Sequence, residues 1–204
     1  MRRELGLEDV VLLGHSGHAF IAVEYALRYP EHVSKVALFN TAPTNSPERQ
    51  RQSFASFDET ASPGRKRHFE AEIAKLADDP AREPERRFAH VCIRMGAHGF
   101  YDFTTDGAPL WDGVTMAMPI LDHLWGEAFE QLDLRDRLPR LEKPVMLGLG
   151  HYDYLVGPLS LWEGIEARCP HVTKLIFERS GHTPMLEQAE EFASHWRAWL
   201  GRDA

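Results

Sequence analysis

The sequence predicts an α/β protein: a parallel sheet of about four strands, interrupted by a helical insertion. Four short runs rich in apolar residues predict the strands, at 10–13, 33–39, 144–150 and 172–177; the first ends in glycine, and the third is bounded by proline and glycine. Segments with helical spacing of apolar residues alternate with these runs, which is typical of parallel strands. The block between the second and third runs is more charged and more broken, which predicts the insertion.

The first strand, the helix after it and the second strand form one crossover unit. Val10–Leu13 is fully apolar and is followed by a glycine, as in a strand that is covered on both faces. Pro30 lies just beyond a segment whose apolar residues recur at helical spacing, at Ala19, Ala22, Val23, Ala26 and Leu27. The apolar run Val33–Phe39 supplies the second strand, so the two strands are expected to be parallel.

The middle block, 42–140, is predicted to be a helical insertion on the sheet. Turn-forming stretches at 58–64 and 78–84 divide it. Helices are expected at 65–77, 86–95 and 113–129. Aromatic residues crowd this block, and they are expected to form a small helical core, an apolar wall over a pocket, or both; they are Phe100, Tyr101, Phe103, Trp111, Trp125 and Phe129.

The third block returns to alternating strands and helices. A strand at 144–150 and a strand at 172–177 enclose a helical segment at 159–167. The last helix is amphipathic, because its apolar positions step by four and three residues, at Met185, Ala189, Phe192, Trp196 and Trp199. The predicted core therefore combines 1–41 with 141–204, and the insertion separates these two parts of the chain.

Composition and charge exclude several classes of protein. The chain has 204 residues, with 23 basic and 31 acidic side chains and a formal net charge of −8. This balance argues against nucleic acid or an anionic membrane as a partner, because both are bound through clustered Lys and Arg. Cys92 and Cys169 form no CxxC pair, so buried thiols in a reducing compartment are expected. The sequence shows no secretory signal pattern and no apolar run near ~18 residues, so we expect a cytoplasmic protein without a membrane span.

The strongest functional signal is Gly14-His15-Ser16-Gly17-His18, between the first predicted strand and the first helix. A serine at such a turn projects its hydroxyl above the edge of the sheet. The backbone N–H of Gly17 points the same way and can donate a hydrogen bond to an oxyanion. Gly14 meets the need for a small residue where strand and helix approach, whereas His18 departs from the usual glycine of this pattern.

A nucleophilic serine needs a base and a carboxylate that orients the base, and the third block offers both. Asp153 follows the strand at 144–150, and His182 follows the strand at 172–177. The carboxyl ends of parallel strands meet at one edge of a sheet, so we expect Ser16, Asp153 and His182 to form a catalytic triad. Weaker candidates for the carboxylate are Asp133, Asp136 and Glu163.

A substrate pocket is expected next to Ser16, and the candidates for binding substrate there are His15, His18 and Trp125. His15 and His18 are three residues apart, but no carboxylate completes a set of ligands with them, so no metal site is expected. The predicted chemistry also needs no cofactor.

Together these motifs resemble the α/β-hydrolase superfamily and, within it, the proline iminopeptidase-like group. The resemblance covers almost the whole chain, and the segments that carry it are 12–20, 150–154 and 178–184, with weaker similarity at 110–114 and 123–127. It implies that Ser16 is the nucleophile, His182 the base and Asp153 its orienting partner. The implied reaction proceeds through an acyl-enzyme on a small amide or ester, so the expected partner is a small molecule or a short peptide. Residues 42–140 would form the cap over the site.

The resemblance leaves several substrates open. For an aminopeptidase it implies an acidic cap residue that holds the substrate's free amine, and the candidates are Asp102, Asp106, Asp112 and Glu127. A carboxylesterase or lactonase, a carbon–carbon bond hydrolase and a cofactor-free haloperoxidase use the same triad and are the alternatives. Relatives with an aspartate nucleophile, such as epoxide hydrolases and haloalkane dehalogenases, are disfavoured because position 16 is serine.

The resemblance also implies that the chain lacks the usual N-terminal half of the fold, because its nucleophile strand begins near residue 9. The chain would hold the C-terminal half of the hydrolase sheet, with the first strand at an exposed edge. We therefore expect self-association, or a complementing N-terminal chain, at this strand, and weak activity without a partner. A non-catalytic or partner-dependent fragment is the alternative to an active serine hydrolase.

Overall fold

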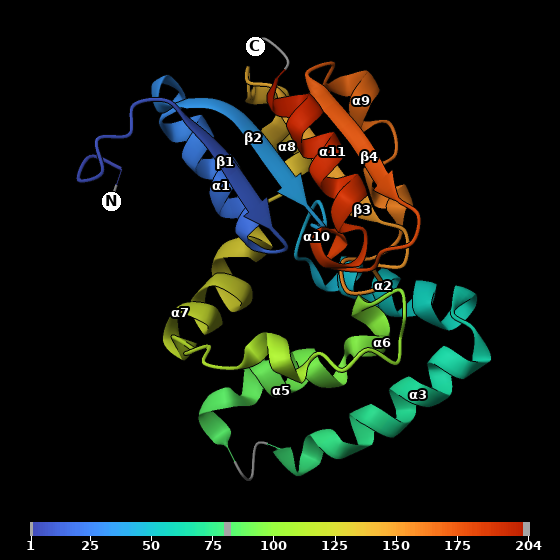
Figure 1. The fold of residues 1–204 in the computed structure, drawn as a ribbon. Coiled ribbons are helices and arrows are strands. Elements are labelled where there is room, and N and C mark those ends of the chain that lie inside the picture. The colour runs from blue at the N-terminus through green and yellow to red at the C-terminus, as the bar shows by residue number, and fades with distance from the viewer. Residues whose placement is uncertain (1, 80–82, 202–204) are drawn as a thin grey trace.

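The computed structural model describes residues 2–79 and 83–201, and its centre is a four-stranded parallel sheet. The sheet has the order β1-β2-β3-β4 (Figure 1), with the bounds β1 (Val10–His15), β2 (Val33–Phe39), β3 (Val145–Gly150) and β4 (Val172–Phe177). Every neighbouring pair is parallel; Leu12 lies opposite Val36, and Val36 lies opposite Val145. The predicted fold class, with its four parallel strands, is confirmed.

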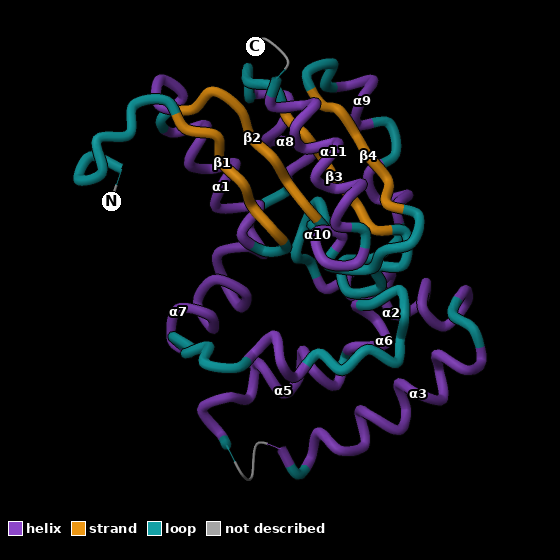
Figure 2. The backbone as a smooth tube through the Cα atoms, viewed as in Figure 1, coloured by secondary structure: helices purple, strands orange, loops and turns teal. Residues whose placement is uncertain are grey.

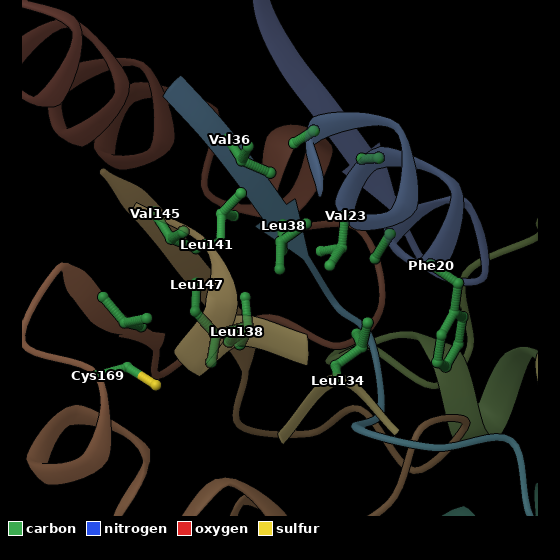
Figure 3. Packing of buried hydrophobic residues seen from close by; sticks show 14 of the residues in the cluster. Phe20, Val23, Val36, Leu38, Leu134, Leu138, Leu141, Val145, Leu147 and Cys169 are labelled. Carbon is green, nitrogen blue, oxygen red and sulfur yellow. The ribbon is translucent and has the colours of Figure 1, made fainter. Parts of the chain in front are cut away.

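One face of the sheet carries the larger hydrophobic core. Figure 3 shows Val36, Leu38 and Leu147 of the sheet packed with Val23 and Leu134, and all five side chains are fully buried. Each such side chain contributes roughly 1.5–3 kcal/mol by leaving water. The helices that supply or flank this core are α1 (His18–Arg28), η1 (Pro30–His32), α8 (Leu134–Arg137), η7 (Leu138–Arg140), η8 (Leu159–Trp162) and α9 (Ile165–Arg168).

The other face is covered by the C-terminal helices α10 (Pro184–Glu187) and α11 (Ala189–Leu200). Phe39, Met146 and Phe177 from three adjacent strands pack there with Trp199 of α11. No residue of β1 belongs to this cluster. The side chains of Val11 and Leu13 on β1 are 38% and 49% exposed. The first strand therefore lies at the edge of the sheet, as expected, with part of its apolar surface uncovered.

The segment between β2 and β3 is helical, and Figures 1 and 2 show most of it beyond the carboxyl ends of the strands. Its last two helices, α8 and η7, return to the sheet, where Leu134 and Leu138 belong to the core cluster. The preceding helices are α2 (Pro47–Thr60), α3 (Pro63–Ile73), η2 (Ala74–Ala77), η3 (Pro84–Arg86), α5 (Arg87–Arg94), α6 (Gly96–Gly99), η4 (Ala108–Trp111), α7 (Met118–His123), η5 (Leu124–Ala128) and η6 (Phe129–Gln131).

Helix α2 lies in a segment for which the sequence pattern predicts no helix. Ser46 caps its N-terminus by accepting a hydrogen bond from the Arg49 N–H at 3.2 Å, and Pro47 is its first residue. This serine–proline pair is a helix-start signal that the apolar spacing of the segment does not reinforce. The helix matters for the site, because Arg49 lines the central cavity described below.

Two predicted helices are shorter than expected. The helix predicted at 113–129 begins only at Met118, because Gly113 has a left-handed φ of 70° and Pro119 fits only the first turn of a helix. The helical segment predicted at 159–167 is broken at Gly164, whose φ is 71°. The predicted turn at 78–84 lies partly outside the described residues.

Two of the expectations from composition concern the cysteines and membrane-spanning helices. Cys169 is buried and Cys92 is half-buried, and both are free thiols. Burial raises the pKa of Cys92 to about 12, so this thiol stays protonated at neutral pH. Across residues 2–79 and 83–201, no helix combines the length and the apolar character needed to cross a membrane.

Candidate active site

Ser16 occupies the tight turn between β1 and α1. Its φ is 55°, in the left-handed region that residues other than glycine rarely adopt. The Ser16 N–H donates to the carbonyl oxygen of Phe39 at 2.9 Å, which ties the turn to the end of β2. A strained serine on a strand-to-helix turn is the geometry of a nucleophile elbow, in which the hydroxyl is exposed above the sheet.

The close approach of strand and helix at this turn involves the backbone of Ala19 and His18. A Cβ added to Gly14 would lie 2.6 Å from the Cα of Ala19, so only glycine fits at position 14. The His18 side chain is exposed at the first position of α1. The elbow therefore tolerates a histidine where the usual pattern has glycine, because the side chain at position 18 is exposed and lines the cavity.

Gly17 is confined by an aromatic side chain from the insertion. A Cβ at this position would lie 2.4 Å from Cζ2 of Trp125, which sits in the π-helical turn η5. Gly17 is the N-cap of α1, where backbone N–H groups have no partner inside the helix. This placement leaves its N–H suitable for an oxyanion, which is the role that the sequence predicts.

Asp153 and His182 are joined directly. The distance between Nδ1 of His182 and Oδ2 of Asp153 is 2.8 Å. Asp153 is 4% exposed, and its Oδ1 accepts a hydrogen bond from the Leu155 N–H at 3.1 Å. This contact occupies one ring nitrogen of His182 and leaves Nε2 free to exchange protons.

The serine and the base share one cavity. Ser16 and His182 both line a cavity of about 800 Å³, and His15, His18 and Trp125 line it too. No direct hydrogen bond joins the Ser16 hydroxyl to His182 among the described contacts, as is common in unliganded sites, where this bond tightens when substrate binds. The structure thus brings the predicted nucleophile, base, oxyanion donor and three substrate-binding candidates to one cavity, and buried Asp153 contacts His182 there.

Asn40 is a site residue that the sequence analysis does not single out. It follows the end of β2, is fully buried, and has a left-handed φ of 47°. Its Nδ2 donates both to Oδ2 of Asp153 at 2.8 Å and to the carbonyl oxygen of Gly181 at 2.7 Å. The signal for it was a polar residue directly after an apolar strand, at the same sheet edge as Asp153 and His182.

The short helix α6 (Gly96–Gly99) contacts the loops that carry Asp153 and His182. The His182 N–H donates to the Gly99 carbonyl oxygen at 2.6 Å, and the Tyr154 N–H donates to the His98 carbonyl oxygen at 2.9 Å. A Cβ on Gly181 would lie 2.2 Å from the Gly99 oxygen, so the two backbones touch. No local sequence pattern predicts this contact, because Gly99 and Gly181 are about 80 residues apart in the chain.

His15 packs against the base. Its Nε2 lies 2.7 Å from the carbonyl oxygen of His182, and the two rings are 4.6 Å apart between centroids. Burial, with the nearby His182 ring as the next cause, lowers the pKa of His15 to about 4. His15 is therefore neutral at ordinary pH, and its protonated nitrogen can donate to the His182 backbone without adding a charge beside the base.

The charges around the cavity are uneven. Among the described residues that line it, Arg49 is the only arginine or lysine, and no aspartate or glutamate is present. The four predicted amine-binding acids lie elsewhere: two bind their own loops and one pairs with a histidine, and they are Asp102, Asp106, Asp112 and Glu127. The structure therefore does not bring these acids to Ser16.

The other predicted alternatives also lie away from the base. Asp133 caps α8 and binds Arg135, and Asp136 lies 3.9 Å from Arg168. Glu163 is exposed at the end of η8. Within the described part of the chain, no three His, Cys, Asp or Glu side chains are grouped in a way that would hold a metal ion.

Comparison with known proteins identifies the relatives of this chain. Residues 2–195 match the model of the alpha/beta hydrolase family. The chain is 56% identical over 200 residues to the AB hydrolase superfamily protein YclE of Bacillus subtilis (strain 168), a match that covers 98% of this chain and 71% of that protein. The predicted superfamily is thus confirmed, whereas the expected absence of an N-terminal half stays a prediction.

Two solved structures are similar to the whole chain. A thermophilic esterase from Thermogutta terrifontis matches with a TM-score of 0.65 and 24% identity, over 98% of this chain and 67% of the esterase. A proline iminopeptidase from Mycobacterium smegmatis matches with a TM-score of 0.68 and 19% identity, over 98% of this chain and 67% of the other. At these identities the two structures show a shared fold. Since the matched family region includes the elbow and both loops of the acid and the base, the chain belongs to the alpha/beta hydrolase family.

Proposed function

We propose that the protein is a serine esterase that hydrolyses carboxylic esters through an acyl-enzyme. The observation that carries this proposal is one cavity that holds Ser16 and His182, backed by the 2.8 Å contact between His182 and Asp153, with no carboxylate among the described residues that line it. The elbow supplies the nucleophile, and the histidine–aspartate pair supplies the base.

Acylation begins when the Ser16 oxygen attacks the ester carbonyl carbon and His182 Nε2 takes the hydroxyl proton. The carbonyl oxygen becomes an oxyanion, which the Gly17 N–H stabilises. A single such donor contributes roughly 2.7–4 kcal/mol to transition-state stabilisation. The bond to the alcohol oxygen then breaks, and His182 returns the proton to the departing alcohol, which leaves Ser16 acylated.

Deacylation repeats these steps with water. His182 takes a proton from the water as it attacks the acyl carbonyl, and the bond to Ser16 breaks as the proton passes to the serine oxygen. The products are the free acid and the original enzyme. Throughout, Asp153 holds the imidazole and balances its positive charge, with Asn40 and the Leu155 N–H holding Asp153.

The lining of the cavity favours an ester over the substrate of a proline iminopeptidase-like enzyme. A free amino terminus is a cation, and a cation that leaves water needs a carboxylate or several oxygen partners. The described cavity offers an arginine instead, and the acidic cap candidates lie outside it. An ester needs no such partner, because its polar atoms meet the oxyanion donor and the catalytic residues.

A fluorophosphonate probe tests the proposal, because only an activated serine displaces its fluoride. Intact mass should show one label on the wild-type chain, no label on Ser16→Ala and much slower labelling of His182→Ala. In a substrate panel, 4-nitrophenyl esters should be hydrolysed, and prolyl-4-nitroanilide should not. If a folded wild-type chain takes no label, the alternative of a non-catalytic or partner-dependent fragment holds instead. Faster cleavage of the prolyl amide than of every ester would favour the aminopeptidase.

A further inference from the structure

Arg49 lines the cavity that holds Ser16 and His182. Three of its five N–H groups are used within the protein: Nε donates to the Thr44 carbonyl oxygen at 3.2 Å, Nη1 to the Leu155 carbonyl oxygen at 3.0 Å, and Nη2 to Oδ1 of Asn45 at 2.8 Å. Asn45 is 7% exposed and its own amide donates to the Trp125 carbonyl oxygen. The guanidinium is thus held in one orientation, with two N–H groups left over.

The charge of Arg49 is not neutralised by a neighbouring acid. No described carboxylate lies within ion-pair distance of it, whereas Arg94 of helix α5 pairs with Asp79 at 2.7 Å. Burial lowers the pKa of Arg49, and the more distant Asp153 opposes that shift. The Asp153 carboxylate is already bound to His182 and Asn40, so a positive charge in the cavity has no dedicated partner.

We propose that Arg49 binds a carboxylate of the substrate, so that the preferred substrates are esters that also carry a free carboxylate group. This inference rests on the proposed esterase activity. Two free N–H groups of one guanidinium match the two oxygens of one carboxylate in a bidentate pair. The rest of the lining is mainly apolar, including Trp125 and Leu124, so it suits the hydrocarbon between the carboxylate and the ester.

A carboxylate fits this cavity better than a phosphate does. Arg49 supplies one positive charge, and a carboxylate supplies one negative charge. A phosphate monoester carries nearly two negative charges at neutral pH, and the second would be buried beside apolar side chains without a cation. The chain as a whole has a net charge of −8 and repels anions, so recognition of an anion depends on this local cation.

The test compares carboxylated esters with a neutral ester of similar size. The 4-nitrophenyl monoester of glutaric acid carries the carboxylate on the acyl side, 4-acetoxybenzoate carries it on the alcohol side, and 4-nitrophenyl butyrate carries none. The ratio of kcat/KM for a carboxylated ester over the neutral ester should fall roughly 10- to 100-fold in Arg49→Met, mainly through KM. The ester that shows the larger fall identifies the side on which the carboxylate is bound.

A neighbouring arginine gives a matched control. Arg51 lies on the same helix and pairs with Glu48 on the exposed surface, so Arg51→Met should leave the ratio unchanged. Arg49→Lys keeps the charge but not the bidentate geometry, and it should restore part of the ratio. An equal loss of activity on charged and neutral esters would mean that Arg49 only tethers its loops. A wild-type ratio that no variant alters would likewise overturn the inference.

Binding of free glutarate separates this inference from the esterase proposal. Calorimetry should detect glutarate binding to the wild-type chain and to Arg51→Met, and at least ~10-fold weaker binding to Arg49→Met. If no ester is hydrolysed and no serine is labelled while glutarate still binds through Arg49, the esterase proposal fails and the carboxylate site stands. If esters are hydrolysed while glutarate binds equally to all three chains or to none, the carboxylate site fails and the esterase stands.

Discussion

At the scale of single residues, unusual backbone conformations gather at the catalytic edge. Ser16 and Asn40 are the only non-glycine residues with positive φ in the described part of the chain, and they follow the neighbouring strands β1 and β2. Each such conformation costs of order 1–3 kcal/mol, and it persists where the surrounding structure holds it. Here these conformations accompany a serine that lines the cavity and an asparagine amide that donates to Asp153.

Two variants of Asn40 test its role in positioning the acid. Asn40→Gly removes the amide without straining the left-handed backbone, and kcat should fall roughly 10- to 100-fold because a hydrogen bond to a charged group is lost. Asn40→Asp keeps the shape but places a second carboxylate against Asp153, so a larger loss and an altered pH profile of kcat are expected. Thermal melting would verify that both variants fold. Full activity of Asn40→Gly would show that Asp153 is held without it.

At the scale of elements, the helical segment between β2 and β3 lies mostly beyond the carboxyl ends of the strands and contacts the loops of Asp153 and His182. Helix α6 bonds to the loops of Asp153 and His182 through its backbone. Its His98 side chain is 1% exposed and stacks on Phe57 of α2, with ring centroids 3.7 Å apart. Neither ring nitrogen of His98 has a partner among the described residues. Helix α6, which bonds to both loops, is thus fixed within an aromatic cluster that contains an uncharged histidine.

The burial of His98 predicts how stability changes with pH. Burial, with Arg65 as a smaller cause, lowers the pKa of His98 from 6.5 to about 4. The unfolded chain therefore binds a proton below pH 6.5 that the folded chain refuses until about pH 4. Stability should fall through that window, by up to roughly 3 kcal/mol from His98. Below pH 4 this contribution adds no further loss.

Urea unfolding between pH 7 and pH 4 measures this effect. In His98→Phe, the unfolding free energy should fall less between pH 7 and pH 4, because a phenyl ring keeps the stacking and cannot titrate. His195 is exposed near Glu191, so the unfolding free energy of His195→Gln should fall with pH as that of the wild-type chain does. His15 has a similarly lowered pKa, so part of the decline should persist in His98→Phe. A His98→Phe chain that declines as steeply as wild type would refute the assignment.

At the scale of the whole molecule, the edge strand is the least covered part of the sheet. β1 pairs only with β2 among the described strands, and its Val11 and Leu13 side chains are exposed. An exposed edge with apolar side chains is a template for pairing with another chain. The strand also leads directly into Ser16, so whatever covers this edge acts on the element that carries the nucleophile.

We expect a second copy of the chain to pair at this edge in the purified protein. Light scattering after gel filtration should show dimers or larger species, and Leu13→Lys should shift the chain to monomer, because lysine opposes edge pairing. Leu186 is also exposed, at 56%, but lies on α10, so Leu186→Lys should not change the mass. A wild-type chain that is monomeric at high concentration would contradict self-association through β1.

Local patterns in the sequence were enough to predict the sheet and to place Ser16, Asp153 and His182 at one of its edges, whereas the triad that they would form stays a prediction. Short runs rich in apolar residues identify β1 to β4, because parallel strands are usually covered on both faces. Ser16, Asp153 and His182 directly follow three of these strands, and the carboxyl ends of parallel strands share one edge. These predictions depend on neighbours along the chain, which the sequence contains.

Only the tertiary structure decided what surrounds the triad. It placed Arg49 in the cavity and the four predicted amine-binding acids outside it, and it set Asn40 against Asp153. It also joined Gly99 of the insertion to the His182 loop. The physical reason is that these contacts link segments far apart in sequence. Which of them form depends on how the insertion folds back over the sheet, and no spacing within a segment records that path.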